Sequence, residues 1–312
     1  MRIIRDHQFV ASHDKGASVA IGNFDGVHLG HQAVIGLARD AATALNAPLG
    51  VMTFEPHPRQ VFAPDSPPFR LMSAESRANR LDKLGVDLLY ELPFNRVLAA
   101  LDAEAFAREV IAEGLGLRHV VVGDDFHFGK GRSGNANDLA RFGEQMGFGV
   151  TISQMVQGSQ GRVSSTAIRQ ALADGNPRHA AEMLGHWHRI DGPVISGEQR
   201  GRELGYPTAN MSVDGLHLPK LGVYAVLVQV KEGPHKGDYH GVASLGVRPM
   251  FGENKPNLET FIFDFKGDLY GTHLSIGLVD YLRPELKFDG LDALITQMDA
   301  DSAQAREILA AL

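Results

Sequence analysis

Two histidines three residues apart are the first side chains whose spacing suits chemistry. His28 and His31 lie in G-N-F-D-G-V-H-L-G-H-Q (22–32), between an apolar run at 18–21 and a helical pattern. The first turn of a helix carries free N–H groups and partial positive charge, so both imidazoles can face one bound anion. The pair therefore predicts a site that offsets charge at a phosphoryl centre during in-line displacement. Two ordinary surface or capping histidines are the alternative.

A second helix start carries residues of the kind that bind phosphate. The segment at 163–172 reads V-S-S-T-A-I-R-Q-A-L. Ser164, Ser165 or Thr166 would cap a helix whose free N–H groups point at a ligand. Arg169 lies one turn further on and can reach back as a bidentate donor. Ordinary capping is the alternative for this segment alone, but H-x-G-H together with S-S-T-x-I-R resembles the nucleotidyltransferase superfamily, which releases pyrophosphate from nucleoside triphosphates.

A polar segment in the second half, R-G-R-E-L-G-Y-P-T-A-N (200–210), suits a magnesium-bound nucleotide. Thr208 and Asn210 share one face of an extended chain, where a hydroxyl and an amide oxygen are hard ligands for Mg²⁺. Glu259 opens the run E-T-F-I-F-D-F, and beside a substrate hydroxyl it would be suited to general-base catalysis. A polar turn and a solvated carboxylate are the alternatives.

The elements that must position these residues fall into two patterns. In residues 1–185, apolar runs alternate with helical patterns, which predicts an α/β domain with a Rossmann-like parallel sheet. In residues 186–312, runs alternate with turn dipeptides, which predicts a small antiparallel β-barrel followed by a terminal helix from Leu291. In that helix Asp301 and Ser302 interrupt the apolar stripe. The predicted strands are 18–21, 49–54, 88–92, 119–122 and 149–152, then 223–230, 241–245, 259–265 and 274–279.

Composition excludes several classes of protein. The net charge of −7 disfavours nucleic acid as a partner, and the absence of cysteine excludes disulfides, thiolate zinc sites and cysteine nucleophiles. No apolar run approaches the roughly 18–20 residues that span a bilayer, and the first residues lack the pattern of a signal peptide. The glycine-rich segment 123–131 lacks P-loop spacing. We expect a cytoplasmic protein without membrane partners, and self-association is left open.

Taken together and in order, the segments resemble the bacterial bifunctional riboflavin kinase/FAD synthetase family over nearly the whole chain. The matching segments are G-N-F-D-G-V-H-L-G-H-Q (22–32), T-F-E-P-H-P (53–58), V-V-G-D-D-F-H-F-G-K-G-R (121–132), S-S-T-A-I-R (164–169), G-R-E-L-G-Y-P-T-A-N (201–210), G-V-Y (222–224), G-V-A-S-L-G-V-R-P-M-F-G (241–252) and L-E-T-F-I-F-D-F (258–265).

The resemblance implies two reactions. Residues 186–312 would phosphorylate riboflavin with ATP to give FMN, and residues 1–185 would transfer AMP from a second ATP to FMN, giving FAD and pyrophosphate. Mg²⁺ would accompany ATP, while FMN and FAD would serve as substrate and product rather than as redox cofactors. The small-molecule partners would be riboflavin, FMN and ATP.

The resemblance also assigns roles residue by residue. His28 and His31 match the pair that stabilises the adenylyl transition state, Glu259 matches the kinase base, and Thr208 and Asn210 match the Mg²⁺–nucleotide motif. The positions implied in binding ATP for adenylylation are Gly22, Asn23, Phe24, Asp25, Asp125, Ser165, Thr166 and Arg169. Those implied in binding flavin are Phe62, Phe128 and Arg283, and those in the nucleotide loop of the kinase are Gly201, Arg202 and Gly205.

The sequence departs from the family pattern at two places. Leu29 stands where arginine is common in H-R-G-H, which removes one positive charge near the phosphates, and Met250 stands where threonine is more frequent. Two other interpretations are kept. In one, the chain is an adenylyltransferase only, with a non-catalytic flavin-binding β module. In the other, it is a nucleotidyltransferase for a different phosphorylated substrate, such as phosphopantetheine.

Overall fold

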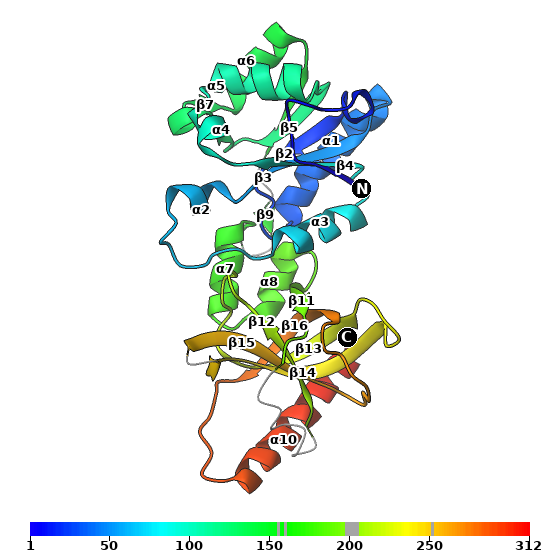
Figure 1. Cartoon of the computed structure of the whole chain (residues 1–312), viewed down its shortest axis with the longest axis vertical. Coiled ribbons are helices and arrows are strands. Elements are labelled where there is room, and N and C mark those ends of the chain that lie inside the picture. Colours follow the sequence, from blue (N-terminus) through cyan, green and yellow to red (C-terminus); the bar gives the residue numbers. More distant parts are fainter. Residues whose placement is uncertain (155–156, 159–160, 197–205, 251–252) are drawn as a thin grey trace. The chain divides into compact units, whose positions relative to one another are not determined.

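The computed structural model describes residues 1–154, 157–158, 161–196, 206–250 and 253–312. The chain forms two compact units, of which one contains residues 1–66 and 74–164 and the other residues 67–73 and 165–312 (Figure 1). Helices α7 (Ser165–Ala173) and α8 (Pro177–Leu184) belong to the second unit. The domain boundary near residue 185 stays a prediction.

A six-stranded parallel sheet forms the centre of the first unit, as the strand–helix alternation predicts. Its strand order is β1-β4-β3-β2-β5-β8, and every neighbouring pair is parallel. In that order the strands are Arg2–Ile4, Leu88–Pro93, Leu49–Glu55, Ser18–Ile21, His119–Gly123 and Gly149–Ser153. The five predicted strands are confirmed to within two residues. The edge strand β1 was not predicted, because its three residues carry no periodic pattern.

Helices cover both faces of this sheet. Helix α1 (Leu29–Leu45) buries Ile35, Ala38 and Ala42 from the predicted stripe and contacts β2 and β5. Side chains alternate along a strand, so Val19 and Ile21 of β2 point to the opposite face, into a core shared with Phe106.

The other elements are η1 (Ser12–Asp14), α2 (Pro58–Phe62), α3 (Ala74–Lys83), α4 (Arg96–Ala100), α5 (Ala103–Ala105), π-helix η2 (Phe106–Gly114), β6 (His127–Phe128), η3 (Lys130–Arg132), β7 (Gly134–Asn135), α6 (Ala136–Met146), β9 (Gln157–Gly158) and β10 (Gly161–Arg162).

The order of strands in the sheet reverses between β2 and β5. From β2 the chain moves to β3 and β4 on one side, whereas β5 and β8 extend the sheet on the other side. Ligands of open parallel sheets bind outside the carboxyl ends of the strands at such a switch point. The segments that leave β2 and β5 at this edge contain residues 22–28 and 124–126, so the topology brings two of the predicted motifs to one place.

The second unit contains an antiparallel sheet in the order β11-β16-β13-β14-β15-β12. Its strands are His188–Pro193, His273–Arg283, Gly222–Val230, Gly237–Met250, Glu253–Ile262 and Thr208–Ser212. Ile195, just after β11, donates its backbone N–H to the carbonyl of Asn210 on β12 at 2.8 Å, so the two edges of the sheet meet. The predicted small barrel is confirmed, with Tyr224, Val226 and Leu258 in its buried interior.

Helix α10 (Leu291–Ala310) packs on the outer face of this barrel, where Ala305 and Leu309 join Phe263 (Figure 1). Asp301 is also buried on this helix, which explains the interruption of the apolar stripe, because its carboxylate pairs with Arg283. In the ranges described, no helix has the length and apolarity required to cross a bilayer.

Candidate active sites

The segment between β2 and α1 has a strained backbone. Phe24 and Val27 adopt φ angles of 51° and 44°, and Gly26 adopts 92°. A side chain in this left-handed region costs about 1–3 kcal/mol, most for a bulky or β-branched residue. Both side chains are fully buried, so the surrounding core holds this conformation. Strain of this kind clusters at functional sites, which directs attention to the residues that follow it.

His28 is the N-cap of α1, and its ring lies against that of His31. Its Nδ1 atom accepts the backbone N–H of His31 at 3.2 Å, and the two rings stack with centroids 3.6 Å apart. A Cβ atom added at Gly30 would lie 3.1 Å from the His28 ring, so the glycine of H-x-G-H makes room for the stack. Since Nδ1 of His28 is an acceptor, the ring hydrogen sits on Nε2, which can therefore act as a donor.

His31 is held in the neutral form. Burial lowers the pKa of its imidazole well below the ordinary value of 6.5, and the neighbouring His28 lowers it further. Its Nδ1 atom is buried and has no hydrogen-bond partner among the described residues. A buried, unsatisfied ring nitrogen is costly, and a bound ligand would satisfy it. The pair therefore offers neutral hydrogen-bonding nitrogens rather than two cations.

The other residues of this loop take different positions. Asn23 is exposed, and its carbonyl accepts the Thr53 hydroxyl at 3.2 Å, whereas Asp25 is buried, with 3% of its surface exposed. Gly22 extends the β2 pairing by donating its N–H to the carbonyl of Met52 at 3.1 Å. The hydrogen bond from Thr53 thus links the loop to β3, the strand that opens the T-F-E-P-H-P motif.

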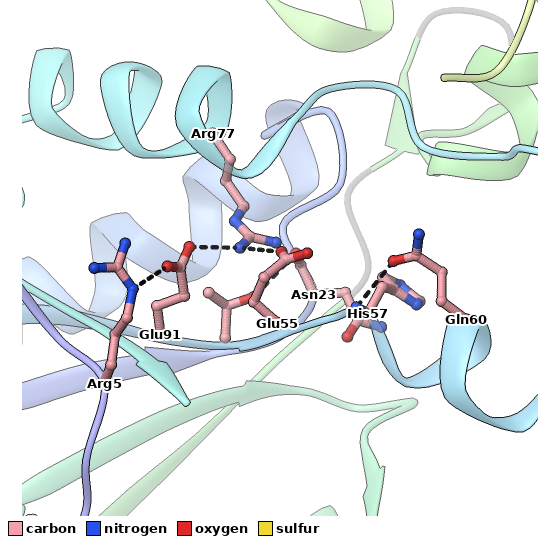
Figure 2. Close-up of polar contacts among 8 residues, drawn as sticks. Arg5, Asn23, Glu55, His57, Gln60, Arg77 and Glu91 are labelled. Atoms are coloured by element: carbon pink, nitrogen blue, oxygen red, sulfur yellow. Dashed lines mark hydrogen bonds and ion pairs between the residues drawn. The ribbon is translucent and has the colours of Figure 1, made fainter. Parts of the chain in front are cut away.

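An ion network that sequence reasoning missed lies at the end of β3. Arg77 of α3 is 1% exposed and its Nη2 atom lies 3.0 Å from carboxylate oxygens of both Glu55 and Glu91, while Arg5 pairs with Glu91 at 2.9 Å. Figure 2 shows these side chains in one row beside Asn23 and His57. The sequence does show carboxylates, Glu55 and Glu91, near the ends of the predicted strands 49–54 and 88–92. No sequence pattern identifies Arg77 as their partner.

Two of the three predicted flavin contacts lie in the first unit. Phe62 ends α2 with 70% of its surface exposed and meets Phe94 edge-on. Phe128 is buried, and its ring stacks on Phe126 at 5.5 Å between centroids. Asp125 lies in the turn after β5, where its carboxylate pairs with Arg162 at 2.5 Å. Of the two aromatic rings, Phe62 has the more accessible surface for stacking.

The S-S-T-A-I-R motif lies in the second unit from Ser165 onward. Helix α7 begins at Ser165, which confirms the predicted helix start, and Thr166 is exposed in its first turn. Arg169 donates Nε–H to the carbonyl of Phe69 at 2.6 Å, and its guanidinium lies over the Phe69 ring. Its own carbonyl lies 3.0 Å from a ring nitrogen of His217. Arg169 thus ties α7 to residues 67–73.

The barrel brings the predicted kinase residues together. Asn210 on β12 lies directly opposite Glu259 on β15, and Thr208 lies two residues earlier on the same face. Asn257 is buried on that face as well. Its amide nitrogen lies 3.2 Å from Oδ1 of Asn210 and 3.3 Å from Oε1 of Glu259. Sequence reasoning did not select Asn257, because a polar residue in a turn-rich region carries no pattern of its own.

Arg283 lies in the same cross-strand row but further along it. The row runs from Arg283 through Val223 and Ser244 to Glu259. Three strand spacings separate Arg283 from Glu259, or about 14 Å between backbones. Two nitrogens of Arg283 bind the buried Asp301 carboxylate, the shorter contact being 2.6 Å, and a third binds the Pro284 carbonyl at 2.9 Å. Arg283 therefore anchors α10 against the sheet, whatever else it binds.

Three predicted residues cannot be placed, because Gly201, Arg202 and Gly205 lie outside the described residues. Among the described residues, no three His, Asp or Glu side chains gather as metal ligands.

Comparison with known proteins agrees with the two-part architecture. The family model for FAD synthetase matches residues 10–167, and that for riboflavin kinase matches residues 184–309. The bifunctional riboflavin kinase/FMN adenylyltransferase of Pseudomonas fluorescens is 40% identical, with 99% of this chain and 98% of the relative covered. The protein of the same description from Escherichia coli K12 is 39% identical, with coverage of 98% and 97%.

A solved structure shares the fold over the same length. The crystal structure described as a macrolide-efflux protein from Streptococcus pneumoniae superimposes with a TM-score of 0.85 at 33% identity, and 98% of each chain is covered. The riboflavin kinase match favours two enzymatic halves over a non-catalytic β module. This chain belongs to the family of bifunctional riboflavin kinases/FMN adenylyltransferases.

Proposed function

We propose that this chain makes FMN from riboflavin and ATP with its second half, and FAD from FMN and a second ATP with its first half. The observation that carries the proposal is the stacked His28–His31 pair at the start of α1, at the point where the strand order of the parallel sheet reverses. An anion-binding helix start at that edge suits a triphosphate substrate.

For adenylylation, an FMN phosphate oxygen attacks the α-phosphorus of ATP in line with the departing pyrophosphate. No covalent enzyme intermediate is required. His28 donates from Nε2, His31 donates from a ring nitrogen, and the free N–H groups of α1 add their partial positive charge. Because His31 is neutral before substrate binds, the pair stabilises the transition state by directed hydrogen bonds rather than by two positive charges.

The remaining predicted contacts complete this half of the proposal. Within the first unit, ATP would be held by the loop residues Gly22, Asn23, Phe24 and Asp25 and by Asp125 after β5. The family resemblance also assigns ATP binding to Ser165, Thr166 and Arg169 of α7. For the flavin ring, the exposed Phe62 is a better stacking surface than the buried Phe128. Leu29 follows the cap with 37% of its surface exposed, and it supplies no charge where arginine is common.

For phosphorylation, Glu259 takes the proton from the riboflavin 5′-hydroxyl as that oxygen attacks the terminal phosphorus of ATP. The bond from this phosphorus to the bridging oxygen breaks, and ADP leaves. Thr208 and Asn210 hold the nucleotide. Their hydroxyl and amide oxygens share one face of β12 with Glu259 opposite, and such hard oxygen donors fit Mg²⁺ that is bound mainly by substrate phosphates. When bound, Mg²⁺ would neutralise charge on the phosphates in transfer.

Incubation of the protein with riboflavin and ATP, followed by chromatographic separation of the flavins, tests both halves. We expect FMN to form first and FAD to follow. Supplied FMN with ATP should give FAD and pyrophosphate directly. Formation of FAD from FMN with no FMN from riboflavin would contradict the kinase half alone.

A further inference from the structure

Asn257 lies between two residues of the proposed kinase site, and no motif accounts for it. It precedes Glu259 by two residues on β15, so the two side chains project from the same face of the barrel. It is 4% exposed, and Asn210 beside it is 8% exposed. The amide nitrogen of Asn257 lies 3.2 Å from Oδ1 of Asn210 and 3.3 Å from Oε1 of Glu259.

This geometry gives each hydrogen of one amide nitrogen its own acceptor. A primary amide carries two N–H groups, and here one is directed to Asn210 and the other to Glu259. The bond to Asn210 identifies Oδ1 as the side of that amide facing Asn257. It uses one of the two lone pairs on Oδ1. The other amide end of Asn210 faces the Thr208 carbonyl at 3.4 Å.

We propose that Asn257 is a positioning residue for riboflavin phosphorylation. It holds the amide oxygen of Asn210 toward the Mg²⁺–nucleotide and the carboxylate of Glu259 toward the riboflavin hydroxyl. One side chain thereby sets the distance between the group that binds the phosphates and the group that takes the proton. The inference rests on the kinase activity proposed above and adds a residue to it. Partners of this kind orient the groups that touch a metal or substrate, and their loss typically costs about 10–100-fold in activity or metal affinity.

A purely structural role predicts a different outcome. A buried amide that serves only to satisfy its neighbours would alter the free energy of unfolding when replaced, without changing the Mg²⁺ requirement or kcat of the folded enzyme. The same strand supplies a matched control. Thr260 is fully buried on the opposite face, in the barrel interior, and its hydroxyl has no hydrogen-bond partner within the described segments.

The experiment compares Asn257→Leu, Asn257→Gln and Thr260→Val with the unaltered full-length protein. Three quantities are measured for each: kcat and KM of FMN formation from riboflavin, FAD formation from supplied FMN, and ADP affinity by calorimetry at stepped Mg²⁺ concentrations. The adenylyltransferase half is the same in every variant, so a difference in Mg²⁺-dependent ADP binding reports the kinase half. Thermal melting shows whether the barrel is folded, and FAD formation shows that the first half is intact.

For Asn257→Leu we expect kcat of FMN formation to fall about 10–100-fold, and the Mg²⁺ concentration that gives half-maximal ADP affinity to rise. Asn257→Gln keeps the amide donor on a longer side chain and should keep part of the kcat and part of the Mg²⁺-dependent ADP affinity. This variant tests the proposal even if the leucine variant does not fold. Thr260→Val should match the unaltered protein. If the unaltered protein makes FMN and both Asn257 variants equal it in kcat and Mg²⁺ dependence, Asn257 has no positioning role. If the unaltered protein makes no FMN, the kinase proposal itself fails.

Discussion

Nδ1 of His28 accepts the backbone N–H of His31, while the rings of the same two residues stack 3.6 Å apart. One side chain therefore caps the helix and also presents Nε2–H to the proposed phosphoryl centre. A substitution that removes the imidazole removes both functions at once. The two functions can be separated because asparagine is among the best N-cap residues but has no imidazole.

The variant His28→Asn should still cap helix α1 but should lose the imidazole donor that FAD formation requires. We expect its free energy of unfolding to stay within about 1 kcal/mol of the unaltered protein, and FAD formation from FMN to fall about 10²–10³-fold. His28→Ala should lose activity equally but also lose about 1 kcal/mol of stability. Urea unfolding and flavin chromatography measure the two effects. Normal FAD formation by the asparagine variant would reduce His28 to a cap.

The variant His31→Ala should also stop FAD formation while FMN formation from riboflavin persists. Its imidazole is the neutral partner of the stack, and its loss removes a preorganised donor, which typically costs about 10²–10³ in rate. The control is the kinase activity of the same preparation. Near-normal FAD synthesis by this variant would mean that the first site is wrongly assigned.

Replacing Glu259 should have the opposite effect on the two reactions. Glu259→Gln keeps the size of the side chain and its place opposite Asn210 but cannot accept the hydroxyl proton. We expect FMN formation to fall about 10²–10⁴-fold, the usual contribution of a general base, and FAD formation from supplied FMN to continue. Undiminished phosphorylation of riboflavin by the glutamine variant would remove Glu259 from this role.

Most of the fold could be predicted because the apolar periodicities are strong. The runs at 18–21 and 119–122 are short and uniformly apolar, and both are central strands. The edge strand Arg2–Ile4 was not predicted, because it is defined by parallel pairing with β4, which is distant in the sequence. Three residues are too few to show a strand pattern of their own. Asp301 disturbs the helical stripe for a tertiary reason, since Arg283 on a distant strand is its partner.

The candidate sites could be predicted only where chemistry follows a local motif. His28 and His31 belong to one helical turn, so their spacing in sequence already implies their proximity. Arg77 meets Glu91, and Asn257 meets Asn210, only through tertiary structure, and no spacing in the sequence encodes those two contacts. The neutral state of His31 also depends on burial, which the motif does not reveal.

Stability should decline in mild acid because of a buried histidine in the barrel unit. Burial, His186 and His217 lower the pKa of His188 from 6.5 to about 3, against a smaller opposing effect of Asp191. The unfolded chain binds this proton below pH 6.5 and the folded chain does not, so stability is complete above pH 6.5 and is lost as the pH falls toward 3. The slope is about 1.4 kcal/mol per pH unit from this group. Urea unfolding between pH 7.5 and 4.5 measures how the free energy of unfolding depends on pH. For His188→Leu we expect this slope to be smaller by the contribution of one proton, and an unchanged slope would contradict the assignment.

The ion network at the end of β3 allows a comparison of two partners of one carboxylate. Glu91 is 4% exposed and pairs with Arg77, which is 1% exposed, and with Arg5, whose side chain is 65% exposed. Arg77→Met should cost about 3 kcal/mol of unfolding free energy, because it removes the cation beside the buried Glu91 carboxylate. The second partner, Glu55, has a side chain that is 32% exposed and adds less to this loss. Arg5→Met should cost less than about 1 kcal/mol, since solvent screens an exposed pair. Urea unfolding at neutral pH measures both, and equal losses would show that burial does not set the strength of this network.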